Sequence, residues 1–156
     1  MKKSKTINYL QFDSWKNLPS DEIKLVDKAY EICEKAYAPY SKFKVGAALS
    51  TESGRIIQGN NQENIAYPSG LCAERVALFF ANANFPNEKI VKIAIVSKGD
   101  IISHDDILSP CGSCRQVMAE VQTRQKSKLK IILVNPDDSA ICFDKVDDLL
   151  PFAFGK

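Results

Sequence analysis

The sequence predicts a three-layer α/β domain, in which a mixed five-stranded sheet carries helices on both faces. An amphipathic helical pattern opens the domain, and a short hairpin follows it. Apolar runs of strand length then alternate with longer helical patterns, which is the element order of layered α/β domains. The chain has 156 residues, of which 45% are hydrophobic. This length and composition fit one hydrophobic core rather than two.

The first 20 residues lack a clear hydrophobic period and are predicted to form an N-terminal arm, with residues 21–156 forming the domain. Ser20 is the expected N-cap of the first helix, because a serine hydroxyl can accept a hydrogen bond from a free N–H at a helix start. Apolar residues then recur at spacings of three and four as far as Tyr37. Pro39 is expected to close this helix.

The later elements follow from changes of period and from turn residues. Two hairpin strands are expected at 44–50 and 55–59, separated by a Gly-containing turn. The remaining expectations are a helix at 72–84, a strand at 90–97, a helix opening at 110–114 and ending near 123, strands at 130–135 and 139–143, and a short helix near 145–150.

Composition excludes several classes of protein. The chain has 21 Lys and Arg against 19 Asp and Glu, and the two signs are interleaved. A nucleic-acid partner is therefore not expected. The apolar runs are far shorter than a membrane span, so no membrane partner is expected and the protein is predicted to be soluble and cytoplasmic. An odd count of five cysteines favours reduced thiols, used for metal binding or chemistry.

Three of the five cysteines fall where helices are predicted to begin. Cys72 precedes one helix, and Cys111 and Cys114 open another. Helix N-termini stabilise thiolates, which are the form of cysteine that binds zinc. Three protein ligands leave one position of a tetrahedral zinc open for water, which is typical of a catalytic site. Cys33 and Cys142 lie in apolar patterns and are expected only to pack in the core.

Two charged residues after Cys72 extend this hypothesis. Glu74 lies in the predicted first turn, where its carboxylate can lean toward the same opening and handle protons. Three thiolates on Zn²⁺ carry a net charge of −1, which opposes ionisation of water. A positive group should offset it, and Arg75 is predicted to donate a hydrogen bond to a ligand thiolate.

The combination of Cys72-Ala73-Glu74 with Pro110-Cys111-x-x-Cys114 resembles the zinc site of the nucleobase deaminases. Three further segments resemble the small cytidine deaminase family: Pro39-Tyr40-Ser41-x-Phe43-x-Val45-Gly46-Ala47-Ala48-Leu49, Gly59-x-Asn61-x-Glu63-Asn64 and Leu149-Leu150-Pro151-x-x-Phe154. The resemblance covers about residues 22–155. It implies a cytidine deaminase-like fold, one zinc ion per subunit and a homotetramer with shared active sites.

The same resemblance implies hydrolysis of cytidine and deoxycytidine to uridine, deoxyuridine and ammonia, a reaction of pyrimidine salvage. Zinc-activated hydroxide would attack C4, with Glu74 as the proton shuttle. The implied nucleoside contacts are Phe43 beside the nucleoside, Asn61 and Glu63 on the ribose 3′-hydroxyl, the Ala73 backbone on the base, and Tyr67 and Phe154 at a neighbouring subunit's site. Without the resemblance, Asn61 and Glu63 would be interpreted as a turn residue and a loop carboxylate.

Two other functions remain open from the sequence. One is a deaminase of another aminopyrimidine nucleoside, such as blasticidin S, which requires the same chemistry. The other is a noncatalytic zinc-stabilised interaction module, which requires four protein ligands and no role for Glu74.

Overall fold

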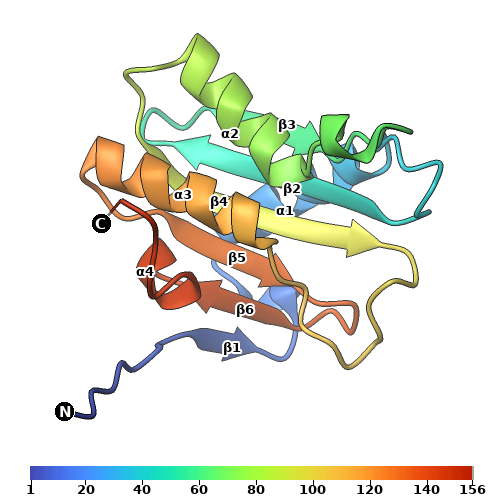
Figure 1. The fold of residues 1–156 in the computed structure, drawn as a ribbon. Coiled ribbons are helices and arrows are strands. Elements are labelled where there is room, and N and C mark those ends of the chain that lie inside the picture. The colour runs from blue at the N-terminus through green and yellow to red at the C-terminus, as the bar shows by residue number, and fades with distance from the viewer. Residues whose placement is uncertain (156) are drawn as a thin grey trace.

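The computed structural model describes residues 1–155, whose strands form one six-stranded sheet in the order β1-β6-β5-β4-β2-β3 (Figure 1). The strands are β1 (Leu10–Phe12), β2 (Lys44–Thr51), β3 (Ile56–Asn60), β4 (Ile90–Lys98), β5 (Lys130–Val134) and β6 (Ala140–Phe143). The helices are α1 (Ser20–Cys33), α2 (Ala73–Asn84), α3 (Gly112–Gln125) and α4 (Val146–Leu149), with short 3₁₀ turns at Trp15–Asn17 and Tyr67–Ser69. β4 and β5 pair in parallel through the α3 crossover, and the other neighbours pair antiparallel.

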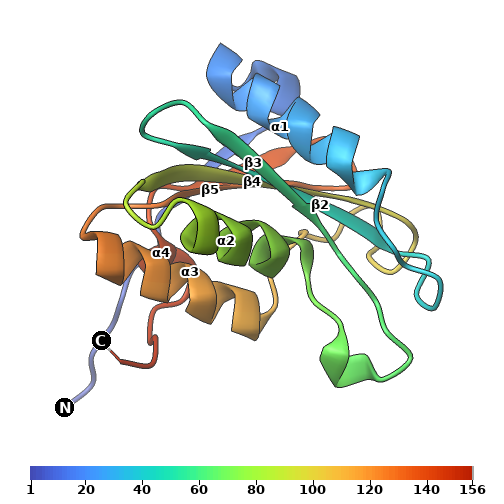
Figure 2. The same ribbon diagram turned by 90° about the horizontal axis from the view of Figure 1, so that it is seen from above.

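The predicted three-layer arrangement is confirmed. Figure 2 shows α1 on one face of the sheet and α2 and α3 on the other. The buried apolar side chains divide in the same way, because one cluster joins α1 to the sheet and the other joins α2 and α3 to its opposite face. Along β5, Ile131 and Leu133 belong to the cluster on the α2 and α3 face, whereas Ile132 and Val134 belong to the cluster under α1, as the pleat of a strand requires.

The strand count differs from the prediction of five, because the N-terminal arm contributes β1. Leu10 pairs with Cys142 and Phe12 with Ala140, so β1 covers the free edge of β6. Trp15 continues this attachment: the centre of its ring lies 5.8 Å from that of Tyr30, and its backbone N–H donates to the Asp138 carbonyl at 2.9 Å. β1 has only three residues, which is too short for a period to be recognised, and its partner edge is defined only in the folded sheet.

The predicted limits of the first helix are wrong at both ends. Pro19 occupies the N-cap position and Ser20 is the first helical residue, without a capping side-chain bond. The helix ends at Cys33 rather than beyond Tyr37. The Tyr37 N–H instead donates to the Asn61 carbonyl at 3.1 Å, and its carbonyl accepts from the Glu63 N–H at 2.9 Å. This pairing takes the backbone of Tyr37 away from the helix, and the other predicted elements agree to within two residues at each end.

Two glycines allow helices to approach the sheet closely. A Cβ on Gly46 of β2 would lie 2.1 Å from the Ala29 carbonyl oxygen of α1. A Cβ on Gly59 of β3 would lie 2.7 Å from the Ala73 carbonyl oxygen and 2.5 Å from the Ala77 nitrogen of α2. Glycine is therefore required at Gly59 for the first turn of α2 to rest directly on β3.

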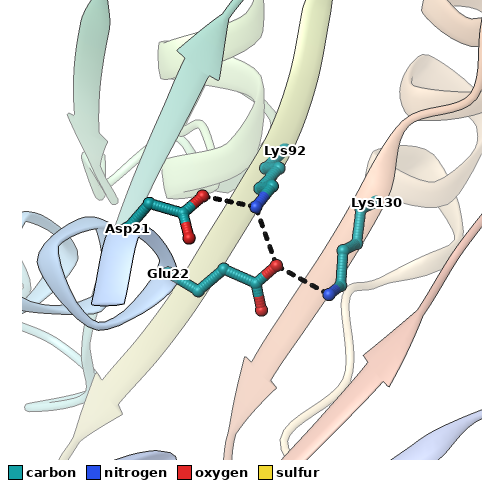
Figure 3. Close-up of polar contacts among 4 residues, drawn as sticks. All are labelled: Asp21, Glu22, Lys92 and Lys130. Atoms are coloured by element: carbon teal, nitrogen blue, oxygen red, sulfur yellow. Dashed lines mark hydrogen bonds and ion pairs between the residues drawn. The ribbon is translucent and has the colours of Figure 1, made fainter. Parts of the chain in front are cut away.

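A buried ion-pair network fixes the start of α1 on the sheet (Figure 3). Glu22 is 2% exposed, and its Oε1 accepts from Lys92 of β4 at 2.8 Å and from Lys130 of β5 at 2.7 Å. Lys92 also pairs with Asp21 at 2.6 Å. A buried carboxylate is tolerated when it is paired in this way, so the network sets which turn of α1 lies over β4 and β5.

Candidate metal centre and active site

Three cysteine thiols meet where α2 and α3 begin. Cys72 is the N-cap residue of α2, Cys111 is the N-cap residue of α3, and Cys114 lies in the first turn of α3. The Sγ atoms of Cys72 and Cys111 are 3.8 Å apart, and those of Cys111 and Cys114 are 3.4 Å apart. All three lie within 4.8 Å of one another. The two helix starts thus bring together residues separated by about forty positions in the chain.

This donor set fits zinc. Thiolates bound at about 2.3 Å in a tetrahedron lie about 3.8 Å apart, and the separations between the thiols are close to that value. The N–H of Cys114 also donates to Cys111 Sγ at 3.4 Å, as expected for a sulfur ligand at a helix N-terminus. Among residues 1–155, no fourth Cys, His, Asp or Glu joins the group. The protein therefore provides three thiol ligands, the number typical of a catalytic zinc.

The charges around the thiols favour a thiolate at Cys72. Hydrogen bonding from the Cys114 thiol, supported by Arg75, lowers the pKa of Cys72 to about 5 although burial opposes this. The pKa of Cys114 is raised, because this thiol donates to Cys72 and is itself buried. A negative charge thus concentrates at Cys72, next to the start of α2.

Arg75 faces this negative charge. Its Nη2 lies 3.7 Å from Cys72 Sγ, and the thiols raise the pKa of the guanidinium, the hydrogen bond to Cys72 contributing most. The Nε of Arg75 is buried and has no hydrogen-bond partner among the described residues. The guanidinium therefore directs one donor at the sulfur and keeps its charge beside the cluster.

Glu74 is the buried carboxylate nearest this cluster in sequence. It is 4% exposed, and burial raises its pKa to about 7, with a further increase from the charge at Cys72. A carboxyl group in such an environment can hold a proton near neutral pH and release it. The arrangement can therefore combine Lewis-acid chemistry with proton transfer.

Hydrogen bonds bring together Phe43, Asn61 and Glu63. The Asn61 amide donates to the Phe43 carbonyl at 2.9 Å and accepts from the Val45 N–H at 2.8 Å, which fixes it against the start of β2. The Glu63 carboxylate accepts from the backbone N–H of Tyr40 at 2.9 Å and from Ser41, whose hydroxyl is the main cause of its lowered pKa. The segment before α2 is thereby joined to the segment before β2.

Tyr67 and Phe154 are not enclosed within this chain. Tyr67 lies in the 3₁₀ turn before α2 and is 90% exposed, and Phe154 near the C-terminus is 89% exposed. Ala73, by contrast, is buried in the first turn of α2, next to Cys72. Of the predicted nucleoside contacts, Ala73 is thus buried within this chain, whereas Tyr67 and Phe154 are exposed.

Arg115 directly follows the last cysteine of the cluster, and its role was not predicted from the sequence. Its guanidinium donates to the Pro110 carbonyl at 2.8 Å, to the Ser109 hydroxyl at 2.6 Å and to the Leu149 carbonyl at 3.1 Å. These bonds fix the loop that leads into Cys111. Its position immediately after the C-x-x-C motif, in the first turn of α3, is the sequence feature that could have pointed to this role.

Cys33 and Cys142 take no part in the cluster, as predicted. They are buried between α1 and the sheet, and burial raises the pKa of each thiol to about 11. They therefore remain neutral packing residues at ordinary pH.

Comparison with known proteins gives the family. Residues 19–128 match the family described as cytidine and deoxycytidylate deaminase zinc-binding region. The chain belongs to this deaminase family. Cytidine deaminase of Halalkalibacterium halodurans is 40% identical over 134 residues, which are 86% of this chain and 94% of that protein. Cytidine deaminase of Sporosarcina psychrophila is 39% identical over 137 residues, or 87% and 93% of the two chains.

The fold agrees with the family. A crystal structure of cytidine deaminase from Burkholderia pseudomallei superposes with a TM-score of 0.72 at 41% identity and covers 85% of this chain and 98% of that chain. Family membership and the three-thiol cluster make this chain a zinc-dependent deaminase that acts on a nucleoside. None of the helices within residues 1–155 is long and apolar enough to cross a membrane.

Proposed function

We propose that this deaminase hydrolyses the 4-amino group of cytidine and deoxycytidine, giving uridine, deoxyuridine and ammonia in pyrimidine salvage. The observation that carries the proposal is the meeting of two helix starts, where three thiols surround a possible zinc position and Glu74 is buried beside them. Relatives that carry the name cytidine deaminase, similar over most of their length, support the choice of substrate. The reducing cytoplasm is the compartment that would keep these thiols available for zinc.

The proposed mechanism divides the work between the cluster and Glu74. Cys72, Cys111 and Cys114 would hold the zinc ion, which would act as a Lewis acid and lower the pKa of water toward neutrality. Glu74 would pass one proton of the attacking water to ring N3, and would then pass the second, from the new C4 hydroxyl, to the amine that leaves as ammonia. Its burial supports this role, because a carboxyl group excluded from bulk solvent passes protons to the substrate rather than to water.

Arg75 has a supporting role in this proposal. Its guanidinium, 3.7 Å from Cys72 Sγ, offsets part of the negative charge of three thiolates. A less negative ligand set opposes the ionisation of water less strongly. Arg75 thus acts on the zinc ligands and not on the nucleoside.

We assign nucleoside binding to Phe43, Asn61, Glu63 and the Ala73 backbone. The Asn61 amide uses one N–H on the Phe43 carbonyl and one Oδ1 lone pair on the Val45 N–H, which leaves one of each for a sugar hydroxyl. The Glu63 carboxylate is fixed by Tyr40 and Ser41 before substrate arrives. Such preorganisation reduces the entropy cost of binding.

The exposed rings of Tyr67 and Phe154 support assembly into a homotetramer in which neighbouring subunits complete each site. Large exposed aromatic side chains are typical of surfaces that become buried in an assembly. We further assign residues 21–156 to the catalytic domain and residues 1–20 to an arm. The family match beginning at residue 19 supports this division.

The substrate test is an ultraviolet assay on zinc-loaded protein, comparing cytidine, deoxycytidine, cytosine, deoxycytidine monophosphate and blasticidin S. The expected result is loss of the cytidine and deoxycytidine absorbance, with release of one ammonia per nucleoside. Turnover of blasticidin S alone would show that blasticidin S, and not cytidine, is the substrate. A protein that leaves every compound unchanged would contradict the deaminase mechanism. Light scattering on the same sample measures the assembly, and a monomer with full activity would contradict the shared site.

A further inference from the structure

Helix α3 holds the C-terminal stretch of the chain through polar side chains along its length. Near its end, Gln122 donates to Asp147 at 2.6 Å and accepts from the Val146 N–H at 2.9 Å. At its start, Arg115 donates to the Leu149 carbonyl at 3.1 Å. Between them, Gln116 reaches Phe154. The helix that carries two of the three cluster cysteines is thus also the support for residues 146–154.

The contact between Gln116 and Phe154 is a paired one. Gln116 Nε2 donates to the Phe154 carbonyl at 3.1 Å, and the Phe154 N–H donates to Gln116 Oε1 at 3.0 Å. The side-chain amide therefore binds Phe154 as a neighbouring strand would, through both backbone groups of one residue. Two such bonds fix the direction of the Phe154 backbone as well as its distance from α3.

The same contact leaves the ring of Phe154 unengaged. Residues 151–155 contain no helix or strand, and no other hydrogen bond to Phe154 occurs within the part of the chain that the structure describes. Phe154 is nevertheless 89% exposed. Gln116 thus holds the backbone while the ring projects outward.

We infer that Gln116 is a positioning residue, which orders the C-terminal segment so that Phe154 is presented to the nucleoside site of a neighbouring subunit. This inference rests on the proposed function, in which Phe154 helps to complete that neighbouring site. An irregular tail loses conformational entropy when it orders on substrate binding, and a tail that is already ordered loses less. Gln116 is two residues after Cys114, so it joins the position of Phe154 to the helix that carries the cluster.

The test replaces Gln116 with methionine, which keeps the length and the helix propensity of the side chain and removes both hydrogen bonds. The control is Gln122→Ala, which removes bonds from α3 to the same C-terminal stretch and to the Leu129 N–H but none to Phe154. Gln116→Met should raise KM for cytidine about tenfold, the effect of losing one or two hydrogen bonds, and change kcat less than about twofold. Gln122→Ala should leave KM unchanged, even if it lowers the melting temperature.

Two further measurements separate positioning from general stability. Amide hydrogen exchange at Phe154 should become about tenfold faster in Gln116→Met and stay unchanged in Gln122→Ala. In a double-mutant cycle, Gln116→Met should add nothing to the KM of Phe154→Ala, because it acts through that ring. An inactive wild-type protein would overturn the proposed function itself. Unchanged KM and unchanged exchange in an active Gln116→Met enzyme would overturn the role of Gln116 alone.

Discussion

Two adjacent residues of α2, Glu74 and Arg75, face the cysteine cluster with opposite charges. Glu74 is buried and its pKa is raised to about 7, mainly by desolvation. Arg75 has a pKa raised by the thiol that it faces and stays positive. Adjacent residues in the first turn of a helix can both lie near the thiols, because Cys72 itself is the N-cap residue of that turn. One residue is therefore suited to proton transfer and the other to charge balance.

Glu74→Gln tests proton transfer. The amide keeps the size of the side chain but cannot accept and return a proton, so we expect kcat for cytidine to fall by about 10³-fold or more. Zinc content, measured by atomic absorption, should stay at one ion per subunit. Equal turnover in Glu74→Gln would exclude this residue as the proton shuttle, and loss of zinc would instead make it a structural support of the cluster.

Arg75→Gln tests charge balance at the thiols. Removing a partner of a metal ligand typically lowers metal affinity or activity about 10–100-fold, and we expect zinc affinity to fall in this range in competition with a chelator. The control is Arg124→Gln, which removes an equal charge from the far end of α3, where Arg124 contacts Asn82. Unchanged zinc affinity and turnover in Arg75→Gln would contradict the assigned role.

At the scale of elements, the site depends on how closely α2 approaches the sheet and on how α1 is held on the opposite face. Gly59 lets the first turn of α2 rest on β3, and the buried Glu22 network fixes α1 on the opposite face. Neither contact touches the thiols. Both contacts instead fix helices on the sheet, and α2 and α3 position the thiols from that sheet.

Gly59→Ala tests the close approach of α2. The added methyl group would meet the α2 backbone at 2.5–2.7 Å, so we expect the free energy of unfolding to fall by about 2–3 kcal/mol. Urea denaturation measures this change. Gly112→Ala is the control, because nothing lies within 4 Å of its Cβ position, and it should be neutral or stabilising by up to about 1 kcal/mol. Equal stabilities of the two variants would show that α2 can move away from β3 without loss.

Glu22→Gln tests the buried network. Removal of its charge leaves Lys130 without its carboxylate partner in a mostly buried site, and we expect a loss of about 2–4 kcal/mol in unfolding free energy. Glu31→Gln breaks the solvent-exposed pair with Lys28 and should change stability little. Thermal unfolding of both variants measures the two changes in stability. A Glu22→Gln variant as stable as the wild type would show that packing alone orients α1.

At the scale of the whole molecule, the N-terminal arm contacts both the edge of the sheet and the C-terminal segment. β1 lies along β6, and Lys5 donates to the Pro151 carbonyl at 2.7 Å. The family match begins at residue 19, so β1 precedes the part of the chain that the family shares. This added strand covers an edge that would otherwise present unpaired backbone groups.

Deletion of residues 1–13 should uncover the edge of β6. We expect lower stability in urea and an association that grows with protein concentration, because free strand edges pair with one another. Static light scattering measures the association. Deletion of residues 1–4, which are exposed and precede the first attachment at Lys5, is the control and should change neither property. A fully stable 1–13 deletion with unchanged scattering would show that β1 is dispensable.

Most helices and strands could be predicted from periodicity and turn residues, because their burial patterns are local. The end of α1 could not, since Tyr37 leaves the helix for a backbone pairing with Asn61 and Glu63 that is remote in sequence. β1 could not either, because three residues carry no period and the edge of β6 exists only after folding. Helix limits and edge strands depend on partners, whereas core strands carry their pattern in their own residues.

The sequence by itself determined the chemistry of this protein. Three cysteines at helix starts, a nearby glutamate and the spacing of the C-x-x-C motif predict a catalytic zinc site, because ligand type and helix geometry are local properties. The resemblance of these motifs to those of the nucleobase deaminases then implied the reaction. Only the tertiary structure decided how the pieces support one another. It placed the thiols within 4.8 Å, aimed Arg75 at Cys72 and joined Gln116 to Phe154. These contacts cross between elements, and their distances follow from how α2, α3 and the C-terminal segment pack on one sheet.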